Sequence, residues 1–143
     1  MKDSDKGFKK IIENIEKYSR LEAKIGIVDP NIAEYAFYNE EGTVDIPKRS
    51  FLASTFDDNK GWSGNIEYVR KLVLTGEEPI HAFSKFVCEI AVKDIKEKIS
   101  SNIQPPNAES TIARKTKGKG GRVTTLIDTG AMRNAVTFEI SLK

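Results

Sequence analysis

Length, composition and charge place this chain among small single-domain proteins with a basic end. Its 143 residues, 38% hydrophobic and 31% charged, are enough to bury one core, so we expect one domain over residues 1–143. No apolar run reaches the about 18 residues of a membrane helix, and the charged start MKDSDKGFKK does not resemble a secretory signal. We therefore expect no membrane partner.

The single cysteine and single histidine limit the chemistry. Cys88 has no second cysteine for an intramolecular disulfide, and with His81 it gives no zinc set. Seven positions apart on one helix, the two also make a poor nucleophile–base pair, so Cys88 is interpreted as core packing. No carboxylates cluster at ligand spacing, and we expect no metal and no cofactor. Net charge is +2, but residues 101–143 hold 7 Lys/Arg against 3 Asp/Glu, so the basic character comes late.

The N-terminal part predicts a helix, a strand and a second helix. Residues spaced by three and four predict an amphipathic helix over Asp5–Tyr18, and alternation predicts a half-buried strand over Leu21–Ile27. Asp29 as N-cap and Pro at the first position then open a helix over Pro30–Glu41. That helix is apolar nearly all round, so we expect it to be buried on more than one side. The apolar face of the first helix is Phe8, Ile11, Ile12, Ile15 and Tyr18.

The middle of the chain is predicted to be helical. Ser50 can cap a short helix bearing Phe51, Leu52 and Phe56. Trp62, between two glycines, is assigned to a turn, as a lid on the core or a contact residue. Asn65–Thr75 has helical spacing, although VRKLVL also suits a strand, and Glu77–Ser101 has a clear apolar face that predicts a long helix, the spine of the domain.

The C-terminal part predicts a loop, a turn and a strand. Prolines, glycines and the run RKTKGKGGR predict a flexible basic loop over residues 102–125. Ala131–Ala135 can form one helical turn, and Val136–Leu142 alternates as a final strand. The expected fold is α+β: a single domain with a small antiparallel or mixed sheet packed against a long amphipathic helix, and a long basic loop before the C-terminal strand.

The stretch LIDTGAMRNAV resembles the active-site loop of a retroviral-type aspartic protease. Such an enzyme needs a flap and further strands after the DTG, yet only 13 residues follow Gly130 and no second DTG is present. The alternative is that Asp128 or Thr129 caps the turn that follows, with Gly130 allowing a close approach. We interpret Asp128, Thr129 and Gly130 as a structural turn and expect no enzyme activity.

The basic loop has two readings, a plain solvated loop or a contact with DNA or an acidic partner. It lacks an aromatic residue for base stacking, and GKGGR does not fit a phosphate loop. The candidate contact residues are Arg114, Lys115, Lys117, Lys119 and Arg122.

Two stretches resemble the small tail-component, or tail-completion, family of long-tailed bacteriophages. In YAFYNEEGTVDIPKRSFLASTFDDNK the resemblance is carried by Asn39, Glu40, Gly42, Thr43, Ile46, Pro47, Arg49, Phe51, Leu52, Phe56 and Asp57. PPNAESTIARK, followed after the basic loop by LIDTGAMRNAVTFEI, is similar to that family's C-terminal half. The two stretches cover about half the chain, in the family's order.

The resemblance implies a structural virion protein of a tailed phage or phage-derived particle. It would be a neck component, assembled in the host bacterial cytoplasm, that forms a ring joining tail to head. Implied partners are its own copies, with six as a candidate ring number, the neighbouring neck and tail proteins, and genomic DNA through non-specific contact. Candidate ring-interface residues are Glu40, Gly42, Thr43, Ile46, Pro47, Arg49 and Phe51. The alternative is a small basic nucleic-acid-binding accessory protein.

Overall fold

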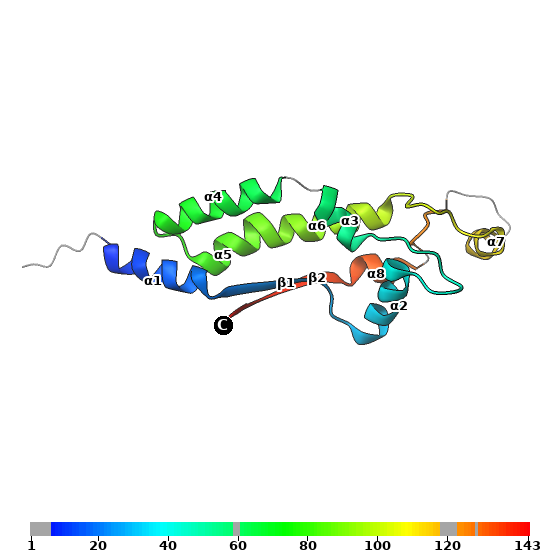
Figure 1. The fold of residues 1–143 in the computed structure, drawn as a ribbon, viewed down its shortest axis with the longest axis horizontal. Helices are drawn as coiled ribbons and strands as arrows, with labels where there is room; N and C mark the ends of the chain where they lie inside the picture. The colour runs from blue at the N-terminus through cyan, green and yellow to red at the C-terminus, as the bar shows by residue number, and fades with distance from the viewer. Residues whose placement is uncertain (1–6, 59–60, 118–122, 128) are drawn as a thin grey trace, which may run out of the picture. The chain divides into compact units, whose positions relative to one another are not determined.

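The computed structural model describes residues 7–58, 61–117, 123–127 and 129–143 (Figure 1). Most of these residues lie in helices. The elements, in chain order, are α1 (Phe8–Ser19), β1 (Leu21–Ile27), α2 (Pro30–Glu41), α3 (Leu52–Asp58), α4 (Trp62–Leu74), α5 (Pro79–Phe83), the π-helical segment η1 (Ser84–Cys88), α6 (Glu89–Ser100), α7 (Glu109–Thr116), α8 (Ala131–Asn134) and β2 (Val136–Leu142).

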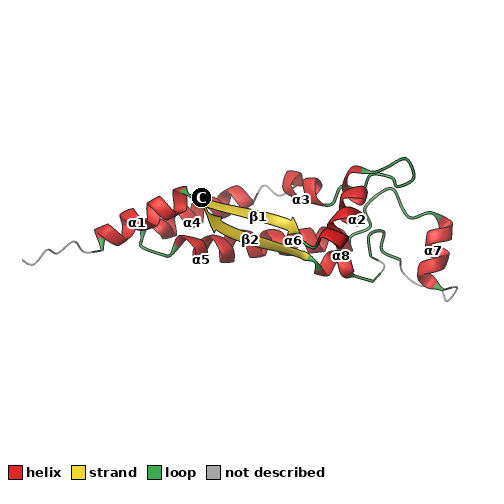
Figure 2. Ribbon diagram, turned by 90° about the horizontal axis from the view of Figure 1, so that it is seen from below, coloured by secondary structure: helices red, strands yellow, loops and turns green. Residues whose placement is uncertain are grey.

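Strands β1 and β2 pair as a two-stranded antiparallel sheet (Figure 2). Both strands have the bounds that residue alternation predicts, because the period-two pattern leaves one side of each strand more apolar than the other. The pairing continues past the strand ends, where the Lys143 N–H donates to the Arg20 carbonyl over 2.8 Å. The predicted α+β class, with a long helix packed on a small sheet, is confirmed.

Residue contacts divide the chain into two compact units, each described by itself below. The first unit comprises Met1–Ile25, Asn59–Ala91 and Phe138–Lys143, and the second comprises Gly26–Asp58 and Val92–Thr137. Three elements, β1, α6 and β2, contribute residues to both units.

The first unit is a helical packing of α1, α4, α5 and η1. Its core consists of Val69, Val73, Ala82 and Val87. Tyr18, Leu72, Phe83 and Phe86 pack around this core. Helix α4 confirms the predicted helix over Asn65–Thr75 and begins earlier, so that Trp62 is its first residue rather than part of a turn.

Helix α1 buries only part of the apolar face predicted for it, since Ile11 and Tyr18 are half-buried and Tyr18 packs on the core. Phe8, Ile12 and Ile15 are exposed, whereas Asn14 is 3% exposed. The Asn14 amide donates to the carbonyls of Gly76 (3.1 Å) and Glu77 (2.9 Å), which follow α4. The apolar stripe of α1 is wider than the surface on which the helix packs. The two buried carbonyls need hydrogen-bond donors, so a polar side chain, Asn14, is buried there.

The long helix predicted over Glu77–Ser101 is confirmed as the consecutive segments α5, η1 and α6. It begins with Pro79 at its first position and with the Glu78 carboxylate accepting from the His81 N–H over 2.9 Å. Cys88 is fully buried in η1, and burial raises the pKa of its thiol to about 11. The Cys88 side chain therefore packs as an apolar group and stays protonated at neutral pH.

Two predictions for the second unit are wrong. Helix α2 begins as expected, with the Asp29 carboxylate accepting from the Asn31 N–H over 3.0 Å, but Tyr35, Phe37 and Tyr38 are exposed and only Ala36 and Asn39 are buried. Apolar residues lie on all sides of α2, but only one side of the helix is buried.

The basic loop predicted over residues 102–125 contains helix α7. The segment ESTIARKT has no proline or glycine, and these lie in the flanking residues. Lys117, in the left-handed conformation with φ 48°, ends the helix. Lys119 and Arg122 lie outside the described residues.

Candidate functional site

The Glu40 carboxylate, at the end of α2, caps helix α3. Its oxygens accept from the backbone N–H groups of Phe51 (2.8 Å), Leu52 (2.8 Å) and Ala53 (2.9 Å), and from the Ser50 hydroxyl (2.7 Å). These N–H groups are the ones that the start of a helix leaves without intrahelical partners. Glu40 thus takes the capping role predicted for Ser50, which instead supports Glu40.

The same contacts set the protonation state of Glu40. Burial by itself raises the pKa of the carboxyl, but the four donated hydrogen bonds outweigh burial and hold its pKa below the ordinary value. Glu40 is therefore a stably charged cap, held by four hydrogen bonds in this unit.

The segment after α2 is a tight loop that presents Val44. Gly42 has φ +79°, and a Cβ there would lie 2.9 Å from the Lys48 backbone nitrogen, so only glycine fits. The Thr43 N–H donates to the Ile46 carbonyl over 2.7 Å, and the Thr43 hydroxyl accepts from the Ile46 N–H over 3.0 Å. The Val44 side chain is fully exposed at the tip, and Thr43 and Pro47 are exposed beside it.

Arg49 connects two stretches that are far apart in sequence. Its side chain is buried, and its Nε and Nη2 donate to the carbonyls of Pro105 (2.7 Å) and Pro106 (3.0 Å). Its backbone N–H donates to the Asn39 carbonyl over 2.7 Å. The two stretches that carry the family resemblance therefore meet at Arg49.

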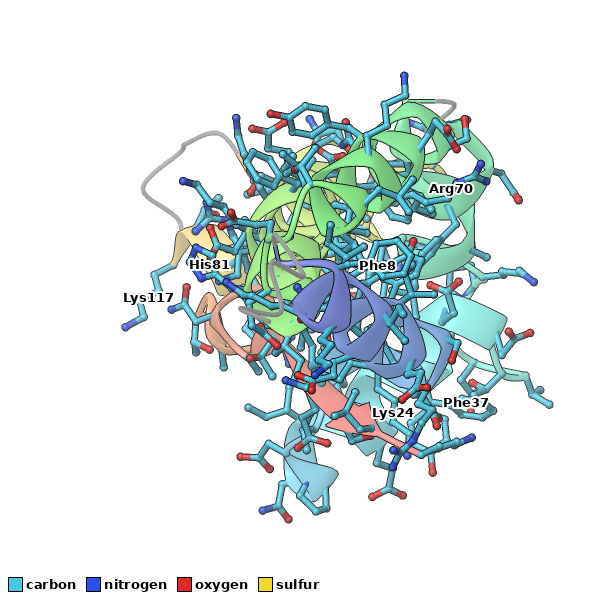
Figure 3. The ribbon with its side chains drawn as sticks, turned by 90° about the vertical axis from the view of Figure 1, so that its left-hand side faces the viewer. Phe8, Lys24, Phe37, Arg70, His81 and Lys117 are labelled. Atoms are coloured by element: carbon cyan, nitrogen blue, oxygen red, sulfur yellow. The ribbon has the colours of Figure 1, made fainter. Side chains whose placement is uncertain are left out.

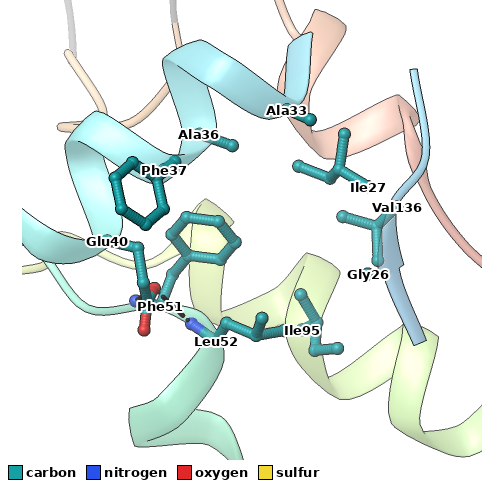
Figure 4. Close-up of a pocket in the computed structure, with 10 residues that line it drawn as sticks. All are labelled: Gly26, Ile27, Ala33, Ala36, Phe37, Glu40, Phe51, Leu52, Ile95 and Val136. Carbon is teal, nitrogen blue, oxygen red and sulfur yellow. Dashed lines mark hydrogen bonds between the residues drawn. The ribbon is translucent and has the colours of Figure 1, made fainter. Parts of the chain in front are cut away.

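Phe51 lies inside the unit, as part of an apolar cavity of about 170 Å³. Figure 4 shows this cavity between α2, the start of α3, α6 and the two strands. Its lining includes Ala33, Ala36, Phe37, Phe51, Ile95 and Val136. Of the predicted ring-interface residues, Arg49 and Phe51 are thus buried, and Thr43 and Pro47 are on the surface.

The basic residues that the structure describes have different surroundings. The Lys115 ammonium, on α7, donates to the carbonyls of Thr124 (3.2 Å), Thr125 (3.2 Å) and Ile127 (2.8 Å), and so holds the chain that follows α7. Arg114 is exposed on the same helix, and the exposed Lys117 side chain extends away from the ribbon (Figure 3). Lys115 therefore stabilises the fold, whereas the Lys117 side chain is exposed to solvent.

The turn before α8 has the form expected of a structural turn. The Thr129 hydroxyl accepts from the Ala131 N–H at 3.3 Å, and Gly130, with φ +82°, accepts from the Asn134 N–H. Asp128 lies outside the described residues.

A second cavity, of about 360 Å³, opens between α2, the 42–49 loop and the start of α7. Its lining combines charged, aromatic and proline side chains. It includes Tyr35, Asp45, Arg49, Pro106, Thr111 and Arg114. This volume is at the lower end of the range for small-ligand pockets.

Local sequence reasoning missed the roles of Glu40 and Arg49. Glu40 caps a helix that begins 12 residues later, and Arg49 reaches carbonyls 56 and 57 residues away. No local spacing rule detects such pairs, and the only sequence signal was that both residues belong to the motif of the resemblance.

None of the described helices is long and apolar enough to cross a membrane. Within the described ranges, no three His, Cys, Asp or Glu side chains are grouped to hold a metal ion. No protein-family model, curated protein or solved structure matches this chain.

Proposed function

We propose that this chain is a structural protein of a tailed phage or phage-derived particle, a tail-completion or neck component. In this role it forms a ring of its own copies that joins tail to head, and it resides in the virion neck or tail end. The observation that carries the proposal is the Arg49 contact with Pro105 and Pro106, because it joins the two stretches that resemble the family. Motif residues that depend on each other in space are better explained by one shared fold than by two chance matches.

The loop of residues 43–47 is the proposed ring contact. A ring requires one surface of each copy to meet a different surface of the next. Val44 is a fully exposed apolar side chain on a loop fixed by Gly42 and Thr43, so it can be buried against a neighbour at little cost in ordering. The Arg49 N–H bond to the Asn39 carbonyl (2.7 Å) joins the two ends of the chain that carries this loop.

The environment of the single cysteine also supports a structural role over a catalytic one. The Cys88 thiol is buried with its pKa raised to about 11, so it is a poor nucleophile at neutral pH. We propose that DNA contact, if the ring encloses DNA, is non-specific and made through Lys117 and its basic neighbours, because Lys115 is engaged with three carbonyls.

Deleting the gene from its phage or prophage and imaging the induced lysate by electron microscopy tests the proposal. We expect DNA-filled heads beside separate, otherwise complete tails. A plasmid copy should restore joined particles, a Val44→Asp copy should not, and a Val28→Asp copy, changed at another exposed valine, should. Normal infectious particles after deletion would contradict the neck role.

The dependence on salt concentration distinguishes the proposed ring from the alternative, a nucleic-acid-binding accessory protein. Binding to phosphates weakens steeply as salt rises, whereas a ring held by apolar and mixed contacts persists. Analytical ultracentrifugation at low and high salt, with and without duplex DNA, should show salt-resistant oligomers. A monomer that binds DNA only at low salt would favour the alternative.

A further inference from the structure

The second cavity of the second unit, about 360 Å³ in volume, contains a buried charge without a counter-ion. Arg49, 7% exposed, donates to two carbonyls, which are neutral acceptors. No carboxylate among the described residues forms an ion pair with it. Removing a cation from water without an anionic partner is costly, so this site favours an anion.

One nitrogen of Arg49 remains available to a ligand. A guanidinium carries five N–H donors, and the two carbonyl bonds use only Nε and Nη2. In the described part of the chain, every fully buried side-chain nitrogen or oxygen has a hydrogen-bond partner. Nη1 forms no hydrogen bond with described residues, so it must be reachable by solvent, on a side chain that lines the cavity. The two carbonyl bonds fix the plane of the guanidinium and pre-organise Nη1 as a donor.

The rest of the lining selects the kind of anion. Arg114 and Lys115 add positive charge, and Asp45 is the one carboxylate among the described lining residues. Tyr35, Ile46 and Pro47 add apolar surface. A small inorganic anion would leave this surface wet, whereas an acidic side chain has both a carboxylate and an apolar stem.

We propose that this cavity binds the carboxylate of an acidic side chain presented by a partner protein, with Nη1 of Arg49 as the donor. The site holds an anion and an apolar stem together, and its volume admits one side chain with its flanking backbone. This binding site is independent of a role in a virion.

The probe is N-acetyl-glutamate α-amide, followed by NMR titration of the ¹⁵N-labelled full chain. We expect saturable shifts of the Tyr35 and Thr111 amides with a Kd on the order of millimolar, as suits so small a ligand. The glutamine analogue, which has the same shape without the charge, should bind at least tenfold more weakly, and so should inorganic phosphate. Equal binding of the glutamine analogue, tighter binding of phosphate, or no binding of the glutamate probe would each overturn the proposal.

A pair of variants checks that the probe binds in this cavity. Asp45→Asn removes the carboxylate of the lining without removing a side-chain contact, and should tighten glutamate binding roughly threefold to tenfold. Asp57→Asn makes the same charge change on α3, away from the lining, and should leave binding unchanged. An equal gain in both variants would mean that overall charge governs binding, and the cavity assignment would be wrong.

Discussion

The two units of this chain differ in how much of their irregular backbone is held by polar side chains. In the first, apolar side chains pack into a helical core of Val69, Val73, Ala82 and Val87, and one buried polar side chain, Asn14, bonds to two turn carbonyls. In the second, charged side chains hold irregular backbone. Arg49 and Lys115 donate to carbonyls, and Glu40 accepts from N–H groups at the start of a short helix. The difference teaches that irregular chain needs polar side chains, since its backbone groups must find partners elsewhere.

Replacing Arg49 with methionine should have the largest effect. Two carbonyls lose a charged donor, so the free energy of unfolding should fall by about 2–4 kcal/mol. Urea denaturation measures the loss, and hydrogen exchange should rise across residues 102–107 more than in α4. Lys48→Met, at an exposed neighbour paired with Glu41, is the control and should cost less than about 0.5 kcal/mol. Equal exchange increases in both units would break the comparison.

Val69→Ala tests the apolar unit in the same way. It removes two methyl groups from a fully buried site and should cost about 2–3 kcal/mol, from lost transfer energy and the cavity left behind. Ile66→Ala, at an exposed position of the same helix, should cost less than about 1 kcal/mol. Exchange should rise first in α4 and α5. If residues 102–107 responded as strongly, the two kinds of stabilisation would not be separable.

Glu40→Gln should have a smaller effect, about 1–2 kcal/mol. The amide oxygen can still accept hydrogen bonds at the start of α3, but the negative charge that strengthens them is lost. Thermal unfolding measures the change, with Glu41→Gln as the adjacent control. A loss in the control as large as in Glu40→Gln would show that the capping contacts contribute little.

The smallest effect is the pH dependence that Glu40 confers. Its folded pKa lies below the ordinary value of 4.5, so its stabilising contribution is present above pH 4.5 and is lost as pH falls through the folded pKa. Between pH 7 and pH 3, the wild type should therefore lose more stability than Glu40→Gln. Parallel pH profiles of the two proteins would show that the hydrogen bonds do not stabilise the charged form.

The regular elements could be predicted, and most of the site could not. Alternation and helical spacing predicted both strands, α4 and the long helix, because these signals depend on neighbouring residues. Helix α7 was missed because proline and glycine around it dominated the local composition. The burial of Asn14 on α1 was also missed, because the two carbonyls that bind its side chain lie 62 and 63 residues away.

By itself, the sequence determined the α+β class, the strand bounds, the Asp29 cap and the motif that resembles a phage family. Only the tertiary structure decided that Glu40 caps α3, that Arg49 binds the Pro105–Pro106 carbonyls and that Lys115 serves the fold. The physical reason is the distance along the sequence over which each interaction acts. Periodicity and capping act within a few residues, whereas a buried polar group is satisfied by whichever backbone group the folded chain brings to it.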